Sequence, residues 1–194
     1  MQREGILTYD AAFDLLSRYG NGTEWKNHCV AVAKVAMRLG ELLSSVYALD
    51  AAFLRTASLL HDIGRHRTHD PILHGVEGYY LLTGLGHHRE AFVCISHIMF
   101  GLTSDEAVQY GLPEEDFVPR TFEEQLVPVI DSLVEGDRPV TIEQRLASIR
   151  SRYRGNDYFL ARIEEGAIKV REMISHIRRD SGVSLETVVA EVLS

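Results

Sequence analysis

The sequence predicts an all-α fold. Apolar residues recur at spacings of three and four along most of the chain, as on the inner face of an amphipathic helix. Capping residues and glycines divide these stretches into helix-sized segments. No stretch alternates convincingly between apolar and polar residues, and no internal repeat is present. These observations favour a bundle of helices around one core, and 194 residues are enough for a single domain over 1–194.

Two helices are expected in the N-terminal quarter. Thr8 caps a short helix that ends at Gly20. A long helix then runs from about Glu24 to Tyr47. Its inner stripe carries one histidine among apolar side chains, and it comprises His28, Val32, Val35, Ala36, Leu39, Leu42, Leu43 and Val46.

The middle of the chain places polar residues where core is expected. An apolar helix beginning near Asp50 runs into the doublet His61-Asp62, and Gly64 is expected to end it. The polar loop 65–71 that follows is interpreted as the mouth of a site. The next two helices, at about 72–85 and 89–100, carry His74 and His97 on their apolar faces.

The C-terminal half continues in helices. After an irregular stretch at 101–119, Thr121-Phe122-Glu123-Glu124 forms a capping box that starts a helix to about Glu135. Asp131 lies on its apolar stripe between Val127 and Val134. Three further helices are expected at 141–154, 157–179 and 184–193. We therefore divide the domain into a core at 24–135 and a C-terminal helical extension at 141–194.

Six polar residues share an inward position and come from five helices. A lone inward histidine is usually a satisfied core residue, but each unpaired buried polar group costs on the order of 1–3 kcal/mol. One bound cation would satisfy several of them together, and imidazole and carboxylate suit a divalent metal. The six are His28, His61, Asp62, His74, His97 and Asp131.

Composition narrows the classes of function. The formal net charge of −8 argues against general binding of a nucleic-acid backbone. We interpret the arginine run 145–154 as a solvated helix face, and Cys29 and Cys94 as small core residues. No run of about 18 apolar residues and no signal-peptide pattern is present, which predicts a cytoplasmic protein that does not enter a membrane.

The order His28, His61-Asp62-Ile63-Gly64 and Asp131 resembles the HD-domain superfamily of metal-dependent phosphohydrolases. His74-Gly75 and His97 resemble members that bind two metals, among them bacterial diadenosine tetraphosphate hydrolases and cyclic-dinucleotide phosphodiesterases. The stretch from Pro119 to Glu124 is similar to small uncharacterised archaeal and bacterial HDIG proteins. The resemblance covers about His28 to Glu135.

The resemblance implies a helical bundle with its metal site in the core. His28, His61, Asp62 and Asp131 would hold a first divalent ion, and Asp62 would bridge to a second ion held by His74 and His97. A bridged pair of ions can activate water for attack on phosphorus. Arg65 would offset charge on the phosphoryl oxygens, and His66 and His69 are candidate contacts to the phosphate. The implied partner is a small phosphorylated substrate, expected to be a nucleotide or dinucleotide.

Three readings of function stay open at this stage. The favoured one is a phosphohydrolase that uses metal-activated water, with Asp62 and Arg65 as catalytic residues. The second is a non-catalytic metal-binding module for signalling or interaction. The third is a role at RNA ends that uses the arginines between Arg145 and Arg154. The sequence leaves open one ion against two, the choice among Mn, Fe, Co, Ni, Zn and Mg, and the oligomeric state.

Overall fold

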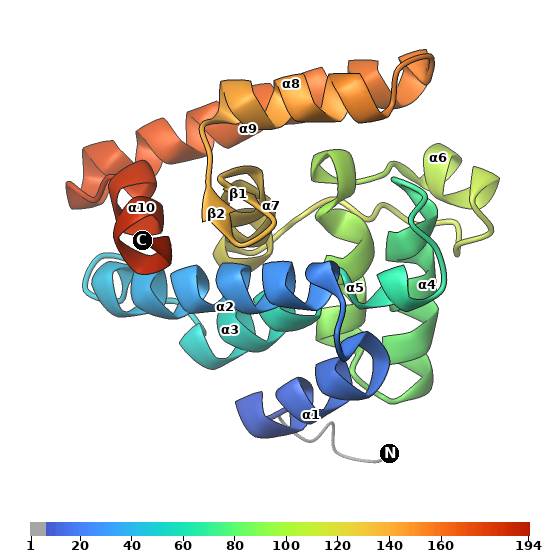
Figure 1. Cartoon of the computed structure of the whole chain (residues 1–194), viewed down its shortest axis with the longest axis horizontal. Coiled ribbons are helices and arrows are strands. Elements are labelled where there is room, and N and C mark those ends of the chain that lie inside the picture. The colour runs from blue at the N-terminus through green and yellow to red at the C-terminus, as the bar shows by residue number, and fades with distance from the viewer. Residues whose placement is uncertain (1–6) are drawn as a thin grey trace.

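The computed structural model describes residues 7–194 and confirms the all-α prediction. The helices lie in layers (Figure 1), with α2 and α3 in the middle, α1 on one side and the α8–α9 pair on the other. Two short 3-10 helices and a two-stranded ribbon complete the fold. The elements are α1 (Tyr9–Gly20), α2 (Glu24–Leu43), α3 (Ala51–Leu60), η1 (Ile63–His66), α4 (Leu73–Gly84), α5 (His88–Ser96), η2 (Ile98–Phe100), α6 (Ser104–Gln109), α7 (Phe122–Ser132), β1 (Val134–Glu135), β2 (Arg138–Pro139), α8 (Ile142–Arg152), α9 (Asp157–Ser181) and α10 (Leu185–Leu193).

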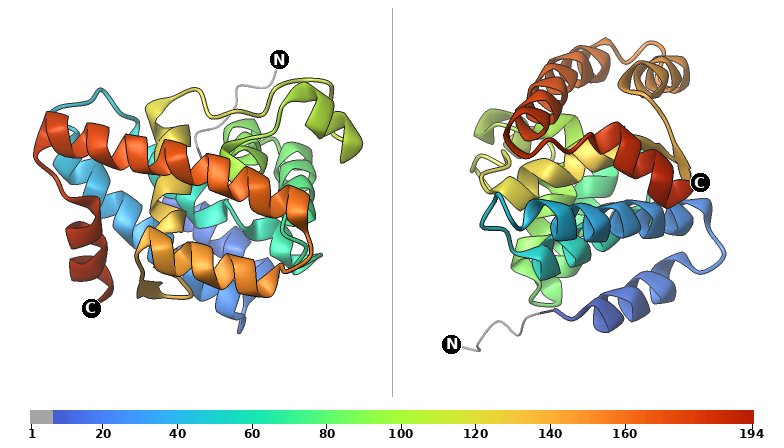
Figure 2. Two further views of the ribbon diagram at one scale, coloured as in Figure 1. Left: turned by 90° about the horizontal axis from the view of Figure 1, so that it is seen from above. Right: turned by 90° about the vertical axis from the view of Figure 1, so that its left-hand side faces the viewer.

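The largest apolar cluster lies between α2, α3 and α7 and continues into α9 and α10. Val32, Val35 and Leu39 of α2 are fully buried in it, as their helical spacing predicts. The views from above and from the side (Figure 2) show α8 and α9 covering α7, while α10 turns back to pack against α2. The C-terminal helices therefore share a core with α2. The division into 24–135 and 141–194 stays a prediction.

The helix expected to reach Tyr47 ends at Leu43 instead, and Val46 is 46% exposed and not part of the inner stripe. Ser44 explains the difference. Its hydroxyl donates to the Glu41 carbonyl, and a turn follows in which the amides of Val46 and Tyr47 both donate to the Leu43 carbonyl. Serine side chains compete with the helix for backbone groups in this way.

Gly64 was expected to stop a helix, and this prediction was wrong. α3 ends at Leu60, and Gly64 lies inside η1. A Cβ at Gly64 would lie 1.8 Å from the carbonyl oxygen of His74 and 2.4 Å from the amide nitrogen of Gly78. The glycine is therefore required because η1 packs directly on the backbone of α4.

The helix expected to reach Phe100 breaks after Ser96. Met99 and Phe100 both adopt left-handed backbone conformations, with φ of 53° and 62°. Such conformations cost on the order of 1–3 kcal/mol for side chains of this size, so the surrounding packing must hold them. Gly166 of α9 supplies part of that packing, since a Cβ there would lie 3.0 Å from the Met99 carbonyl oxygen.

The helix expected to end near Glu135 ends at Ser132 and leads into a short ribbon that the sequence did not predict. Val134 pairs with Pro139 and Glu135 pairs with Arg138. Gly136 makes the tight turn with a φ of +61°. This ribbon places the Gly136 carbonyl beside α2.

Cys29 and Cys94 are buried free thiols, which confirms their interpretation as core residues. Burial raises the pKa of each thiol well above its ordinary value. Across residues 7–194, no helix combines the length and apolar character that a membrane crossing requires.

Candidate metal centre

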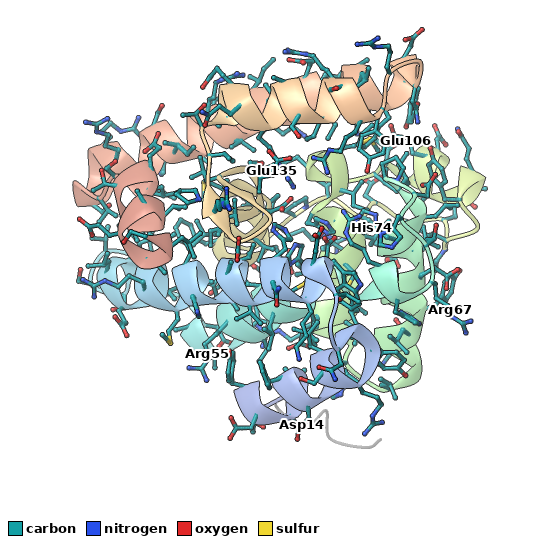
Figure 3. All side chains as sticks on the ribbon, in the orientation of Figure 1. Asp14, Arg55, Arg67, His74, Glu106 and Glu135 are labelled. Carbon is teal, nitrogen blue, oxygen red and sulfur yellow. The ribbon has the colours of Figure 1, made fainter. Side chains whose placement is uncertain are left out.

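The fold brings the six inward-pointing residues to one place. His61 and Asp62 follow the last turn of α3, and the ring of His61 lies 5.3 Å from that of His28 and 5.0 Å from that of His97. His74 of α4 completes the group, with its ring 5.6 Å from that of His97. In Figure 3 His74 lies within the bundle, whereas Arg67, in the polar loop before α4, lies at the outer edge. Five of the six are buried, and the Asp131 side chain is 19% exposed.

One set of atoms that could hold a metal ion comes from α2, α3 and α7. His28, His61 and Asp131 each offer one ligand atom, and these atoms lie within 4.8 Å of one another. Asp131 Oδ1 is 2.9 Å from His28 Nε2 and 3.9 Å from His61 Nε2.

A second set uses His61 again, together with Asp62 and His97. Asp62 Oδ2 lies 4.0 Å from His61 Nε2, and Asp62 Oδ1 lies 3.5 Å from His97 Nε2. His74 Nε2 lies 2.9 Å from the same Oδ1. Asp62 thus lies within 4.0 Å of the Nε2 atoms of three imidazoles, and His61 is shared by both sets.

All four histidines are fixed in the same tautomer. In each, Nδ1 lies at hydrogen-bonding distance from a backbone carbonyl, which can only accept, so Nδ1 must carry a proton. When the ring is neutral, Nε2 then presents a lone pair. The carbonyl partners are Gly136 for His28 at 2.9 Å, Ser58 for His61 at 2.7 Å, Asp70 for His74 at 2.7 Å and Val93 for His97 at 3.1 Å.

The inward atoms lack protein partners that would satisfy them. His61 Nε2, His74 Nε2 and Asp62 Oδ1 are buried without a hydrogen bond. Burial lowers the pKa of His61 to about 4 and also lowers the pKa of His74, so both rings are neutral at pH 7. Lone pairs of imidazole therefore face carboxylate oxygens, an arrangement that repels unless a cation lies between them. This donor set fits a divalent metal ion.

The two carboxylates stay ionised despite their surroundings. Burial alone would raise the pKa of Asp62, but that pKa lies well below its ordinary value, and the charge of Arg65 is the largest cause that lowers it. At Asp131, burial again raises the pKa, but Arg145 and His28 lower it, and the pKa lies below its ordinary value. Arg65 Nε donates to Asp62 Oδ2, and Arg145 Nη2 donates to Asp131 Oδ1 at 3.1 Å.

A cavity leads from three of the six residues to the α8–α9 layer. His74, His97, Asp131 and Arg65 lie at one end of it. The opposite wall is mainly apolar and comes from η2, α8 and α9. Its lining residues are Ile98, Met99, Phe100, Ile142, Arg145, Leu146, Ile149, Arg152, Tyr153, Phe159, Ile163, Gly166, Ala167 and Val170, and Pro71, Pro128 and Ser132 complete the surface.

Arg145 corrects the interpretation of the arginine run as a solvated face. Its side chain is only 14% exposed and faces Asp131, whereas the Arg150 side chain is 55% exposed and bonds to Glu164. The signal was present in the sequence, because Arg145 shares helical spacing with Ile142 and Ile149 on the apolar stripe.

His66 and His69 do not line the cavity. His66 is partly buried, with its ring 4.7 Å from that of Tyr19 and its Nδ1 2.9 Å from the Ile63 carbonyl oxygen. His69 is exposed in the loop before α4. The structure thus brings Arg65 to the cavity but leaves these two candidate phosphate contacts outside it.

Comparison with known proteins gives one family. The model of a family described as "HD domain" matches residues 25–149, a stretch that contains all six inward residues and extends past Glu135 into α8. An uncharacterized protein of Methanocaldococcus jannaschii is 38% identical over 70% of this chain and 81% of its own length.

Two further relatives are named tRNA (cytidine(56)-2'-O)-methyltransferase. The protein from Thermoplasma volcanium is 33% identical over 72% of this chain, and the one from Picrophilus torridus is 28% identical over 96% of it. The matches cover only 40% and 48% of those two proteins. No solved structure matches the chain.

Proposed function

From the premise that this chain belongs to the HD-domain family, which generally comprises metal-dependent hydrolases, we propose that it is a metal-dependent phosphohydrolase. The reaction is hydrolysis of a phosphomonoester or phosphodiester, and the expected substrate is a nucleotide or dinucleotide.

One observation carries the proposal. Four imidazoles present Nε2 toward two ionised carboxylates, and three of these buried atoms have no hydrogen-bond partner. A site built for structure alone would pair such atoms, because each unpaired one costs on the order of 1–3 kcal/mol. A cavity is lined by His74, His97 and Asp131, so a ligand can approach this side of the site.

In this proposal His28, His61 and Asp131 hold one ion, while Asp62, His97 and His74 supply the ligands of a second. When bound, such ions supply Lewis acidity toward phosphoryl oxygens and lower the pKa of water. Four imidazoles with two carboxylates favour Mn, Fe, Co, Ni or Zn over Mg, which prefers oxygen ligands.

The protein's own groups supply the remaining functions. Asp62 is ionised, so it can accept a hydrogen bond from the attacking water and orient it. Arg65 is held on Asp62 by one nitrogen and has further N–H groups that can bind phosphoryl oxygens and offset their growing charge. The carbonyl partners of the histidines keep each Nε2 lone pair directed inward.

The direct test is a substrate panel on protein reconstituted with each candidate ion. At least one compound in the panel should be hydrolysed. The panel contains nucleoside monophosphates, dinucleoside polyphosphates, cyclic nucleotides and simple phosphate esters. Chelation should abolish that activity, and the ion should restore it. Full activity after chelation, on every hydrolysed ester, would contradict the proposal.

A metal-binding module without catalysis is the alternative. It predicts bound metal and ligand binding with no hydrolysis across the panel. The open cavity beside the candidate ligands favours the enzyme, since a purely structural site has no need of one.

A role on RNA receives less support from the surface charge. Within the run 145–154, Arg145 faces Asp131, Arg150 bonds to Glu164 and Arg152 bonds to Glu135. These contacts leave less positive charge for a phosphate backbone. Binding to tRNA that weakens as the salt concentration rises would favour this role instead.

A further inference from the structure

The cavity over the candidate metal centre has two chemically different ends. Arg65, His74, His97 and Asp131 form the charged end. The α8–α9 wall is formed mainly by the apolar side chains of Ile142, Leu146, Ile149, Phe159, Ile163 and Val170. A phosphate ester is divided in the same way, into an anionic group and an organic group.

The wall offers few groups that could read the edges of a base. Among the described residues that line the cavity, Ser132 and Tyr153 are the uncharged polar side chains other than histidine, and there is no Asn, Gln or Thr. Bases are distinguished by bidentate amide, carboxylate or arginine contacts. The charged groups of the wall are already used: Arg145 donates to the candidate metal ligand Asp131, and Arg152 donates to Glu135 Oε1 at 3.1 Å.

We propose that the organic half of the substrate binds against the α8–α9 wall through apolar contact and ring stacking, with little discrimination among bases. This inference rests on the proposed function and adds the part of the molecule that selects the substrate. Tyr153 and Phe159 supply the aromatic surface, with their rings packed edge to face at 5.0 Å.

Part of this wall lies outside the HD-domain match. The match ends at residue 149, whereas Tyr153, Phe159, Ile163 and Val170 come later in the chain. The residues that would hold metal therefore belong to the family region, whereas the surface that would contact the organic group is shared between α8, which lies mostly inside the match, and α9, which follows it.

The wall is held in place by polar contacts behind it. Arg162 of α9 donates to Glu106 Oε1 at 2.7 Å and to the Gly101 carbonyl at 2.9 Å. Tyr158 donates to Glu106 Oε1 at 2.6 Å. These bonds tie α9 to α6 and to the turn after η2, so the apolar surface is formed before a ligand arrives.

The experiment compares binding of phosphonates, whose C–P bond is not hydrolysed, on metal-loaded protein. Methylphosphonate probes the charged end alone, and nucleoside 5'-methylenephosphonates with four different bases probe both ends. Calorimetry should give dissociation constants within about tenfold for the four bases, all tighter than methylphosphonate. Octylphosphonate is measured as well, to compare a flexible apolar chain with a flat base. If either kind of ligand binds more tightly than methylphosphonate, the result supports apolar contact with the wall.

The variant Ile163→Asn places an amide on the wall, and Ile168→Asn is the matched control on the outer face of α9, where Ile168 is 56% exposed. Ile163→Asn should weaken the nucleoside phosphonates about tenfold, equal to about 1.4 kcal/mol, and leave methylphosphonate unchanged. Ile168→Asn should change neither. If Ile163→Asn does not fold, Tyr153→Ala at the partly exposed end of the wall takes its place.

Three results would overturn the inference: one base preferred a hundredfold or more, equal loss for methylphosphonate and nucleoside ligands, or no loss in a folded wall variant. The test is independent of the proposed function. A protein that binds these phosphonates but hydrolyses no ester would contradict hydrolysis and leave the wall intact.

Discussion

Arg145 of α8 and His28 of α2 meet at one atom, since Arg145 Nη2 lies 3.1 Å and His28 Nε2 lies 2.9 Å from Asp131 Oδ1. The arginine fixes the carboxylate and lowers its pKa. A helix beyond residue 141 therefore orients a candidate ligand that belongs to α7.

Arg145→Gln should lower kcat/KM for a hydrolysed ester about 10–100-fold, the usual effect of losing a partner that orients a metal ligand. The matched control is Arg150→Gln, because Arg150 lies on the same helix, is 55% exposed and contacts Glu164. Steady-state kinetics on both variants measures the difference. Equal effects of the two substitutions would contradict an orienting role for Arg145.

Arg65→Met tests the phosphate contact separately from metal binding. Arg65 bonds to Asp62 and lines the cavity. Loss of one donor that stabilises charge in a transition state costs about 10²–10³ in kcat. We expect a loss of that size with the metal content of the purified protein maintained, and Arg65→Lys should recover part of the activity. Wild-type kcat in Arg65→Met would remove Arg65 from the catalytic groups.

Gly64→Ala tests the close packing of η1 on α4. The added methyl would lie 1.8 Å from the His74 carbonyl oxygen, so α4 must move and carry His74 with it. Overpacking costs about 1–3 kcal/mol and occasionally more, which lowers Tm by roughly 2–4 °C per kcal/mol for a chain of this size. Gly84→Ala, at the last residue of α4 with nothing within 4 Å, is the control and should change Tm little. Equal Tm values for the two variants would contradict this packing.

Metal-free protein should lose stability as the pH falls from about 6.5 to about 4. Burial lowers the pKa of folded His61 to about 4, below the ordinary value of 6.5, and lowers that of His74 in the same direction. The unfolded chain therefore binds more protons in this window, and the free energy of unfolding decreases as the pH decreases. Below about pH 4 the depressed pKa values of Asp62 and Asp131 extend the loss.

Denaturant unfolding of the chelated protein at a series of pH values measures this dependence. His61→Gln removes one titrating group and should flatten the slope between pH 4 and 6.5. A free energy of unfolding that stays constant or increases on acidification through that window would show that His61 and His74 are not buried as neutral rings.

The sequence was sufficient to predict the fold class and most helices because both depend on local periodicity and caps. Thr8, Thr23, Thr121 and Thr141 cap helices through their side chains in the structure. Inward histidines and aspartates were recognisable because they interrupt apolar stripes. The comparisons confirm the family that those residues resemble.

The remaining features depend on contacts between distant segments. The break after Ser96 follows from the left-handed turn at Met99 and Phe100, which Gly166 of α9 packs against. The requirement for Gly64 arises from the backbone of α4, which no local pattern contains. The inward position of Arg145 was readable from its spacing, but its partner Asp131 lies on another helix.

Metal content per chain tests the central claim most directly. The protein is reconstituted separately with Mn, Fe, Co, Ni and Zn and then desalted. With at least one of these metals it should retain one or two ions per chain, as measured by inductively coupled plasma mass spectrometry. His61→Gln should lose that metal because His61 belongs to both candidate sets, while His176→Gln, a 50%-exposed histidine on α9, should retain it. Wild-type protein that retains none of these ions, or a His61→Gln variant that binds them as well as wild type, would contradict the account.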